Sequence, residues 1–453
     1  MTADGSALLR AVIANPDDDD RRMVYADHLQ AHGDPQGELI AVQCRLARLA
    51  ADAPERGELE SRAKALLDEH AATWTARLGD RVSHVTYRRG LAYAARAPVR
   101  PGMLDLLDRA PIRDLGMTSG GDDDEEDSPE RLAIARELAA DPRLDRIELL
   151  ATGVRWGEPG FAALVGSEHL TSLRALQISD EDCQVYAGRA LAGAHLPALE
   201  LLALCGDWAA QMGDAGVIAL AGANLPALRD LALLNLWCTS ESARALAESP
   251  TLTQLHGLDF GWGSYNANRI GPAGAIAIAG SPSFAQLRRL VLDFNMIADD
   301  GLAALASSPH LGALRSLSLK SSDLGDAGLR ALATGTGLPQ LETLELTFNR
   351  GITHAGIAAL AESPRLATLS SLWIRQIDLG PEAARAIARS PHARALRSLN
   401  LLECKLGDDG ARALLDSPNL DGLTELQLSG NKLSDDTRGA LRSRWGAAVR
   451  ADR

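Results

Sequence analysis

Two histidines stand at a spacing that can hold a metal ion. His28 and His32 are four residues apart, which places both imidazoles on one face of a helix. Beyond Asp27 and Asp34, the sequence offers no nearby third ligand. We therefore interpret the pair as part of a polar helix face and predict no metal site.

An acidic run, GGDDDEED at residues 120–127, is the second candidate for chemistry. Runs of like charge are typical of solvated loops. Its spacing is not that of an EF-hand loop. The sequence leaves open whether this loop holds a cation.

No arrangement typical of catalysis stands out. The chain has no P-loop, no G-x-S-x-G and no G-x-G-x-x-G motif, and neither Cys44 nor Cys205 has a histidine companion in the sequence. We predict a protein that is not an enzyme and uses no cofactor. The five cysteines lack paired local spacing, which favours a reducing compartment, and we predict a cytoplasmic protein.

Composition narrows the classes of partner. The formal net charge is −14, which argues against a nucleic-acid partner because phosphate binding needs clustered Lys and Arg. No window approaches the roughly 18 apolar residues that span a membrane, and the N-terminus does not read as a secretory signal. We predict no contact with nucleic acid or membrane.

A repeating unit organises most of the chain, and residues 314–340 show it best. Leu314, Leu317 and Leu319 alternate like a strand, and the following apolar residues recur like one face of a helix. One strand and one helix cannot cover each other's apolar faces alone, so the unit needs neighbours. The same opening recurs with starts at Leu144, Leu173, Leu199, Leu228, Leu255, Leu287, Leu314, Leu341, Leu369, Leu396 and Leu423, preceded by weaker versions at Val82 and Ile112.

This pattern resembles the ribonuclease-inhibitor type of leucine-rich repeat. Asn295, Asn349 and Asn431 hold the ninth position of the resembling form, and Cys404 substitutes there. The resemblance covers roughly residues 82–445 and implies an α/β solenoid, a right-handed horseshoe with a parallel concave sheet and convex helices. We expect the inward cysteines Cys183 and Cys238, like Cys404, to be core residues.

Residues 1–78 lack the repeat and predict four helices. The segment LLRAVIANPDDDDRRMVYADHLQAHGDPQGELIAVQCRLARL is similar to the repeat-companion domain of bacterial proteins. That resemblance implies lineage and no defined activity, and leaves open whether the module caps the solenoid or binds separately. The predicted organisation is a helical module at 1–78, a degenerate capping repeat at 79–111, the solenoid at 112–445 and a C-terminal tail at 446–453.

The second half of each unit carries helix signals. Acidic residues such as Asp300 and Asp326 predict caps at the helix start. Ser-Pro pairs, for example Ser363-Pro364, predict the helix end, because proline denies the next turn a donor. Two units are longer than the others and carry insertions, residues 120–127 and 261–269, which we expect to form loops.

Aromatic and charged residues fall at positions that should face the concave side or begin the ascending loops. Aromatic anchors dominate protein interfaces, so we predict a partner-binding surface. Alternatively, the rings cover the loop backbone of neighbouring units. The candidate residues are Trp208, Trp237, Trp262, Tyr265, Asp293, Phe294, Glu345, Phe348, Trp373 and Arg375. The charges on this face lean acidic, which favours a basic partner.

The sequence therefore predicts a non-catalytic scaffold that binds a protein partner through its concave face and ascending loops. The alternative is a regulator of an enzyme, acting as an inhibitor or a GTPase activator on the same surface. The sequence does not identify the partner or fix the oligomeric state.

Overall fold

The computed structural model describes residues 3–119, 128–179, 183–206, 211–261 and 268–452. These residues fall into two compact units. The first contains residues 1–182 and 194–199, and the second contains residues 183–193 and 200–453. In both units strands and helices alternate along the chain, which confirms the predicted α/β solenoid with its parallel sheet and the helical module.

The first unit begins with four helices, at the places that the sequence predicts, and continues with strands. Its helices are α1 (Ala3–Ala14), α2 (Asp19–Ala31), α3 (Gln36–Arg48), α4 (Arg56–Ala76), α5 (Pro129–Ala139) and α6 (Gly157–Val165). Its strands are β1 (Ser83–Arg88), β2 (Leu91–Pro98), β3 (Asp114–Thr118), β4 (Leu149–Thr152) and β5 (Ala175–Ser179). β1 pairs antiparallel with β2, and β2 to β5 pair in parallel.

The second unit alternates short strands with helices of about three turns. Its strands are β6 (Leu201–Cys205), β7 (Asp230–Leu234), β8 (Gly257–Asp259), β9 (Arg289–Val291), β10 (Ser316–Ser318), β11 (Thr343–Glu345), β12 (Ser371–Trp373), β13 (Ser398–Asn400), β14 (Glu425–Gln427) and β15 (Val449–Arg450). Its helices are α7 (Val185–Gly193), α8 (Gly213–Ala221), α9 (Ser240–Ala247), α10 (Gly271–Gly280), α11 (Ala298–Ala306), α12 (Asp326–Thr334), α13 (His354–Glu362), α14 (Gly380–Arg389), α15 (Gly407–Leu415) and α16 (Asp435–Trp445).

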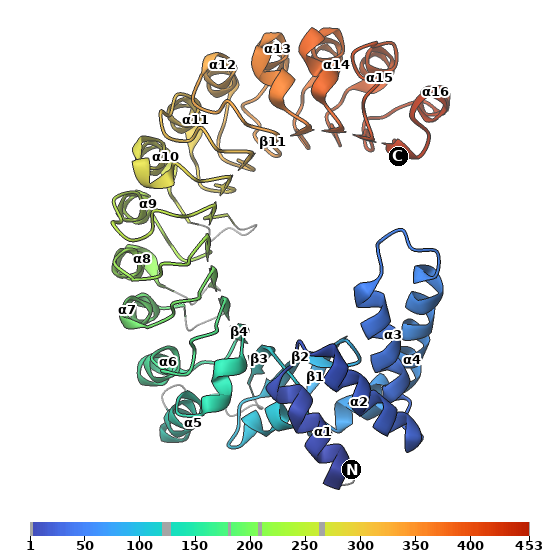
Figure 1. The fold of residues 1–453 in the computed structure, drawn as a ribbon. Coiled ribbons are helices and arrows are strands. Elements are labelled where there is room, and N and C mark those ends of the chain that lie inside the picture. The colour runs from blue at the N-terminus through green and yellow to red at the C-terminus, as the bar shows by residue number, and fades with distance from the viewer. Residues whose placement is uncertain (1–2, 120–127, 180–182, 207–210, 262–267, 453) are drawn as a thin grey trace. The chain divides into compact units, whose positions relative to one another are not determined.

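Neighbouring strands of the second unit pair in parallel from β6 to β15, while α8 to α16 follow one another along the other side (Figure 1). Leucines of the strands and helices fill the layer between them. Leu317, Leu319, Leu329 and Leu332 are all fully buried. Each leucine layer lies against the next, so burial is shared between repeats.

Strand pairing corrects the repeat boundary at Leu144. Leu150 pairs with Leu176, which makes Ile147 the first position of its unit. Leu144 lies instead in a short 3-10 helix, Pro142–Arg146, that precedes the strand. The error arose because leucines of this preceding turn and of the strand are both buried and share a similar spacing.

The segment 79–111 contains a β-hairpin and a short 3-10 helix, Met103–Asp108, in place of the strand and α-helix of a repeat. The hairpin joins β1 to β2 through Arg89 and Gly90, which have φ angles of 51° and 79°. Positive φ at both turn residues gives the primed turn that matches strand twist. At the other end of the chain, residues 449–450 of the expected tail form β15 and pair with β14.

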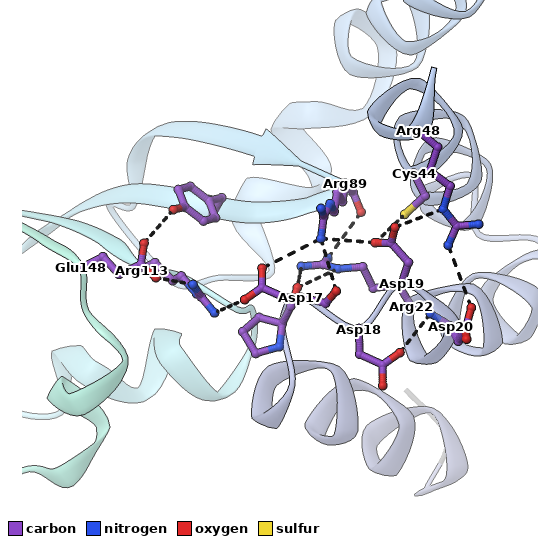
Figure 2. Close-up of polar contacts among 12 residues, drawn as sticks. Asp17, Asp18, Asp19, Asp20, Arg22, Cys44, Arg48, Arg89, Arg113 and Glu148 are labelled. Carbon is purple, nitrogen blue, oxygen red and sulfur yellow. Dashed lines mark hydrogen bonds and ion pairs between the residues drawn. The ribbon is translucent and has the colours of Figure 1, made fainter. Parts of the chain in front are cut away.

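The acidic run at residues 17–20 connects the helical module to the first strands through ion pairs. Asp18 caps α2 by accepting from the backbone of Asp20 and Arg21. Asp17 lies between two arginines of the strand region, with its carboxylate 2.8 Å from Arg113 and 3.9 Å from Arg89 (Figure 2).

The network continues on both sides of Asp17. Arg113 also pairs with Glu148, next to β4, and Arg89 lies 3.3 Å from Asp19 (Figure 2). The buried guanidinium of Arg22 donates to the backbone oxygen of Pro16 at 2.6 and 3.1 Å. Local sequence does not reveal the pairing of Asp17, because Arg89 and Arg113 lie 72 and 96 residues away along the chain.

Asparagines at the ninth repeat position connect successive ascending loops. Asn431 accepts from the backbone N–H groups of Cys404 and Leu406 at 3.0 and 3.1 Å, and donates to the carbonyls of Leu401 and Leu428 at 2.7 and 2.9 Å. Its side chain is 1% exposed. One amide thus satisfies four backbone groups of two successive loops.

Asn268 performs the same role at the end of the insertion in the Leu255 unit. It accepts from the N–H groups of Leu236 and Cys238, both at 3.0 Å, and donates to the carbonyl of Leu233 at 2.6 Å. The sequence analysis missed it, because five inserted residues displace it from the ninth position. Its signal in the sequence is an asparagine that follows the insertion and precedes the next inward apolar residue, Ile270.

Serines of the Ser-Pro pairs form a second ladder beside the helices. Each hydroxyl donates to an alanine carbonyl of the preceding repeat at 2.5 to 2.6 Å, which adds a bond between repeats to the predicted helix end. The serines are Ser167, Ser249, Ser281, Ser308, Ser363, Ser390 and Ser417, of which Ser167 precedes Glu168 rather than proline.

The predicted role of the helix-start acids is wrong in one respect. The residue before α12 is Gly325, which has no side chain to cap the helix. Asp326 bonds instead to the next repeat, where it accepts hydrogen bonds from the N–H and hydroxyl of Thr353 and from the N–H of Gly356, at 2.7 to 3.0 Å. In the preceding unit Asp299, rather than Asp300, accepts from Gly325. Each acid therefore caps the helix of its successor.

Replacing Asp326 by asparagine is expected to lower the free energy of unfolding by about 1–3 kcal/mol at pH 7, since a charged acceptor is lost. Burial opposes ionisation, but the hydrogen bonds of Thr353 and Gly356 outweigh it and lower the pKa of Asp326. Because the pKa of Asp326 is lower in the folded protein than in the unfolded chain, its ionised carboxylate stabilises the fold at pH values above the unfolded pKa. This stabilisation is lost as the pH falls through the folded pKa. Urea unfolding at pH 7 and below pH 4 measures this, and the difference between proteins should shrink in acid.

Asp323→Asn is the matched control, because Asp323 is exposed and its carboxylate has no partner in the described residues. Its unfolding should change by less than about 0.5 kcal/mol. Equal effects of the two substitutions would contradict the cross-repeat cap.

Candidate functional site

The ascending loops of the second unit begin with a left-handed backbone position. The eighth residue of seven repeats has a φ between 45° and 72°, and these residues are Asn235, Phe294, Ser321, Phe348, Gln376, Glu403 and Gly430. This conformation costs a residue with a Cβ roughly 1–2 kcal/mol. The surrounding bonds fix it: the N–H of Phe348 donates to the carbonyl of Arg375 at 3.0 Å, and that of Phe294 to Lys320 at 2.7 Å.

Large apolar side chains stand on these loops. Trp237 and Phe348 are each 41% exposed, and Met296, two residues after Phe294, is 56% exposed. Phe294 is partly buried. We call Trp237, Phe294, Met296 and Phe348 the loop row. Sequence reasoning missed Met296, because it weighed only aromatic and charged residues at this face. Met296 shares the tenth repeat position with Trp237, and both have positive φ.

Three predicted aromatic residues, Trp208, Trp262 and Tyr265, lie outside the described residues, as does the acidic run 120–127. Trp373 is described and half-buried on β12. Its indole N–H donates to the hydroxyl of Ser398 at 3.2 Å, and Ser398 donates to Glu425 at 2.7 Å. Trp373 therefore takes part in a polar chain across β12, β13 and β14.

The predicted charged residues are paired within the protein. Asp293 is 8% exposed and accepts from the Ser318 hydroxyl and the Lys320 N–H at 2.6 and 2.9 Å. The ammonium of Lys320 lies 3.3 Å from the same carboxylate. Asp293 thus orders the next strand and loop, and its lone pairs face protein donors.

Glu345 is 3% exposed and accepts from the N–H of Thr347 at 3.0 Å. The guanidinium of Arg375 lies 3.6 Å from its other oxygen and donates to the Thr347 hydroxyl at 3.1 Å. Burial raises the pKa of Glu345 despite these bonds. Glu345 is therefore enclosed, while Arg375 keeps partial exposure.

A further ion-pair network of three residues spans β7, β8 and β9. Arg289 lies 3.2 Å from Asp259 and 3.5 Å from Asp230. Burial raises the pKa of Asp259, and the hydrogen bond from Gly261 and the charge of Arg289 oppose that shift. Because these carboxylates have cationic partners, the acidic lean of this face is smaller than the sequence alone implies.

The described residues contain no group of three or more His, Cys, Asp or Glu side chains arranged to hold a metal ion. His28 and His32 lie with ring centroids 4.3 Å apart, and Nδ1 of His32 bonds to the backbone oxygen of His28 at 2.8 Å. Cys183, Cys238 and Cys404 are buried in the core, as predicted. Among the described helices, none has the length and apolar character needed to cross a membrane.

A family model described as "Leucine Rich repeat" matches residues 286–306, 314–333, 338–361 and 392–415. These segments are leucine-rich repeats. The match falls on the repeats that carry Phe294, Phe348 and the Asn349 amide, and the repeat structure described above extends on both sides of it. No curated protein sequence matches the chain.

Solved structures of similar fold exist. One is a chain in the crystal structure of the Rad7 and Elc1 complex in yeast, with 16% identity, 94% of each chain covered and a TM-score of 0.49. Another is a protein from Bacteroides fragilis, with 16% identity, 88% of this chain and 84% of that chain covered, and a TM-score of 0.33. At these values neither likeness carries an inference about partner or function.

Proposed function

We propose that this chain is a non-catalytic interaction module, which binds a protein partner through the loop row and the adjoining strand face of the second unit. The observation that carries the proposal is the exposure of Trp237, Met296 and Phe348 on loops whose backbone is fixed by bonds to the next repeat. Fixed apolar anchors bind with little loss of conformational entropy. The charged side chains beside them, Asp293 and Glu345, already form ion pairs within the protein. They therefore shape the surface and are not free to anchor a partner.

We further propose that residues 1–78 are the repeat-companion domain of a bacterial cytoplasmic protein whose repeats are of the ribonuclease-inhibitor type. The residues that carry the resemblance support this through their roles. Asp18 caps α2, Arg22 holds the turn before it, and Gly37 packs so closely that an added Cβ would lie 2.4 Å from the Ala26 carbonyl oxygen. The ion pairs of Asp17 with Arg89 and Arg113 support a capping role for the module.

A variant with Trp237, Phe294, Met296 and Phe348 all replaced by alanine is expected to lose at least about tenfold in partner capture, since interface anchors each contribute more than about 1 kcal/mol. The measurement is quantitative recovery of proteins from native-cell lysate on immobilised full-length chain. A photo-crosslinking residue at position 348 identifies the partner directly.

The matched control replaces Ile218 on α8 and Ile276 on α10, both 52% exposed, by alanine. This variant removes exposed apolar area on the helices and should retain capture, and a crosslinker at position 276 should give no adduct. Undiminished capture by the loop-row variant, or equal loss in both variants, would remove the loop row as the binding surface.

A further inference from the structure

A cavity of about 790 Å³ lies in the first unit, within residues 6–146. The helical module, the β1–β2 hairpin and the 3-10 helix Met103–Asp108 line it. Its volume falls in the range of sites for small molecules. The cavity belongs to neither the loop row nor the strand face of the second unit, so what it binds is independent of the function proposed above.

Two polar side chains on its wall have no hydrogen-bond partner among the residues that the structure describes. Tyr25 is 4% exposed and Trp74 is 2% exposed, and both line the cavity. Neither the Tyr25 hydroxyl nor the Trp74 indole N–H has a hydrogen-bond partner within the described residues. Neither donor atom is among the fully buried polar atoms without a partner, so both reach solvent through the cavity and can donate to an acceptor that enters it.

The surroundings keep the Tyr25 hydroxyl protonated. Burial raises its pKa to about 12, with a further increase from the Asp34 carboxylate and an opposing effect from Arg77. Arg77 lies 2.6 Å from Asp34 and lines the cavity as well. The phenol therefore acts as a donor at neutral pH, beside a guanidinium that is held in place.

The charge of the lining is positive in a chain whose net charge is −14. Arg10, Arg77, Arg109 and Arg146 face the cavity against two aspartates, Asp34 and Asp108. Asp34 pairs with Arg77. Asp108 pairs with Arg143 at 2.6 Å, which lies outside the lining, and with Arg146 of the lining at 3.7 Å. Arg10 has no ion pair among the described residues, so its charge is available to a ligand.

The rest of the wall is apolar. Leu9, Ile13, Leu29 and Leu91 line it, together with Tyr87, whose ring meets Trp74 edge to face at 5.8 Å between centroids. An inorganic ion would leave this apolar surface uncovered, and a neutral hydrocarbon would leave the donors unpaired. The two halves of the lining fit a molecule with one anionic end and an apolar body.

We propose that the cavity binds a small organic anion with an apolar body, whose acidic group accepts from Tyr25 and Trp74 near Arg77 and Arg10. The test is isothermal titration of the full-length chain with 2-naphthoate and decanoate as probes, against neutral 2-naphthamide and inorganic phosphate. At least one organic anion should bind with one site per chain. Both controls should bind at least about tenfold more weakly.

Variants assign the binding to the cavity. Tyr25→Phe removes only the hydroxyl and should weaken anion binding about tenfold, and Arg10→Gln, at an exposed position, should weaken it several-fold. Arg136→Gln on α5 is the control, because Arg136 is exposed and lies outside the cavity. Its affinity should equal that of the unaltered chain.

Several results would overturn the proposal. The proposal is wrong if neither organic anion binds, if 2-naphthoate and 2-naphthamide bind with equal affinity, or if phosphate binds tightly. If Tyr25→Phe does not fold, Arg10→Gln decides, and an unchanged affinity in that variant contradicts the proposal.

Discussion

Replacing Gly90 by alanine is expected to destabilise the first unit by about 3–5 kcal/mol, because the hairpin tip has no room for a methyl group. A Cβ at this position would lie 2.3 Å from the Cα and 2.5 Å from the backbone N of Ile40, on α3. Backbone atoms in a helix cannot move aside without moving the helix. The left-handed φ of 79° adds roughly 1–2 kcal/mol of strain.

The same substitution disturbs two hydrogen bonds between the hairpin and α3. The N–H of Gly90 donates to the Gln43 side chain at 2.8 Å, and its carbonyl accepts from Gln36 at 3.2 Å. Hydrogen exchange is the measurement: amides of α3 and of β2 should lose protection together, while those of β10 to β14 keep theirs.

Gly33→Ala is the matched control. Gly33 lies in the same module with a φ of 74°, but an added Cβ there meets nothing within 4 Å. Its cost should be limited to the strain, roughly 1–2 kcal/mol. Similar losses for both variants would mean that backbone strain, rather than contact with α3, explains the effect at Gly90.

The repeat frame is predictable because its information is local. Period-two leucines such as Leu317 and Leu319 specify a buried strand face, and the helix face follows within the same 27 residues. Position nine could also be predicted, since Asn431 stands at a fixed distance from its first leucine. Of the eleven predicted repeat starts, the one at Leu144 is wrong, because the pattern there does not distinguish the strand from the turn before it.

The remaining features depend on partners in other repeats. The sequence around Asp326 does not show that its carboxylate accepts hydrogen bonds from Thr353. Likewise, the sequence around Asp17 does not show its ion pair with Arg113. The left-handed backbone of Phe348 is also invisible in sequence, since the same position holds glycine in one repeat and glutamate in another. The candidate surface could therefore be located by position, but its rigidity and the pairing of its charges required the structure.

Cys404 shows how far the asparagine position tolerates another side chain. Its thiol donates to the carbonyl of Ile374 at 2.9 Å, as the asparagine amides do to the preceding repeat. Burial raises the pKa of this thiol to about 12, so it remains a donor at neutral pH. A thiol is a weaker donor and acceptor than an amide, which leads to a graded prediction at Asn349.

Asn349→Leu is expected to lower the free energy of unfolding by about 3–5 kcal/mol. Asn349 accepts from the N–H groups of Ser322 and Leu324 at 2.9 and 3.1 Å, and donates to the carbonyls of Leu319 and Leu346 at 2.7 and 2.8 Å. Leucine leaves all four buried groups unpaired, at about 1–3 kcal/mol for each group that water cannot reach. Partial relaxation of the loop keeps the total below their sum.

Asn349→Cys should lose about half as much, because the thiol restores one donor and a weak acceptor, as at Cys404. Asn419→Leu is the control, since Asn419 is partly exposed, and it should cost less than about 1 kcal/mol. Urea unfolding gives the three values, and hydrogen exchange at the Ser322 and Leu324 amides reports the site itself.

Because Phe348 directly precedes Asn349, faster exchange at these amides should accompany weaker partner capture in Asn349→Leu. Loss of stability with capture unchanged would separate the ladder from the binding surface.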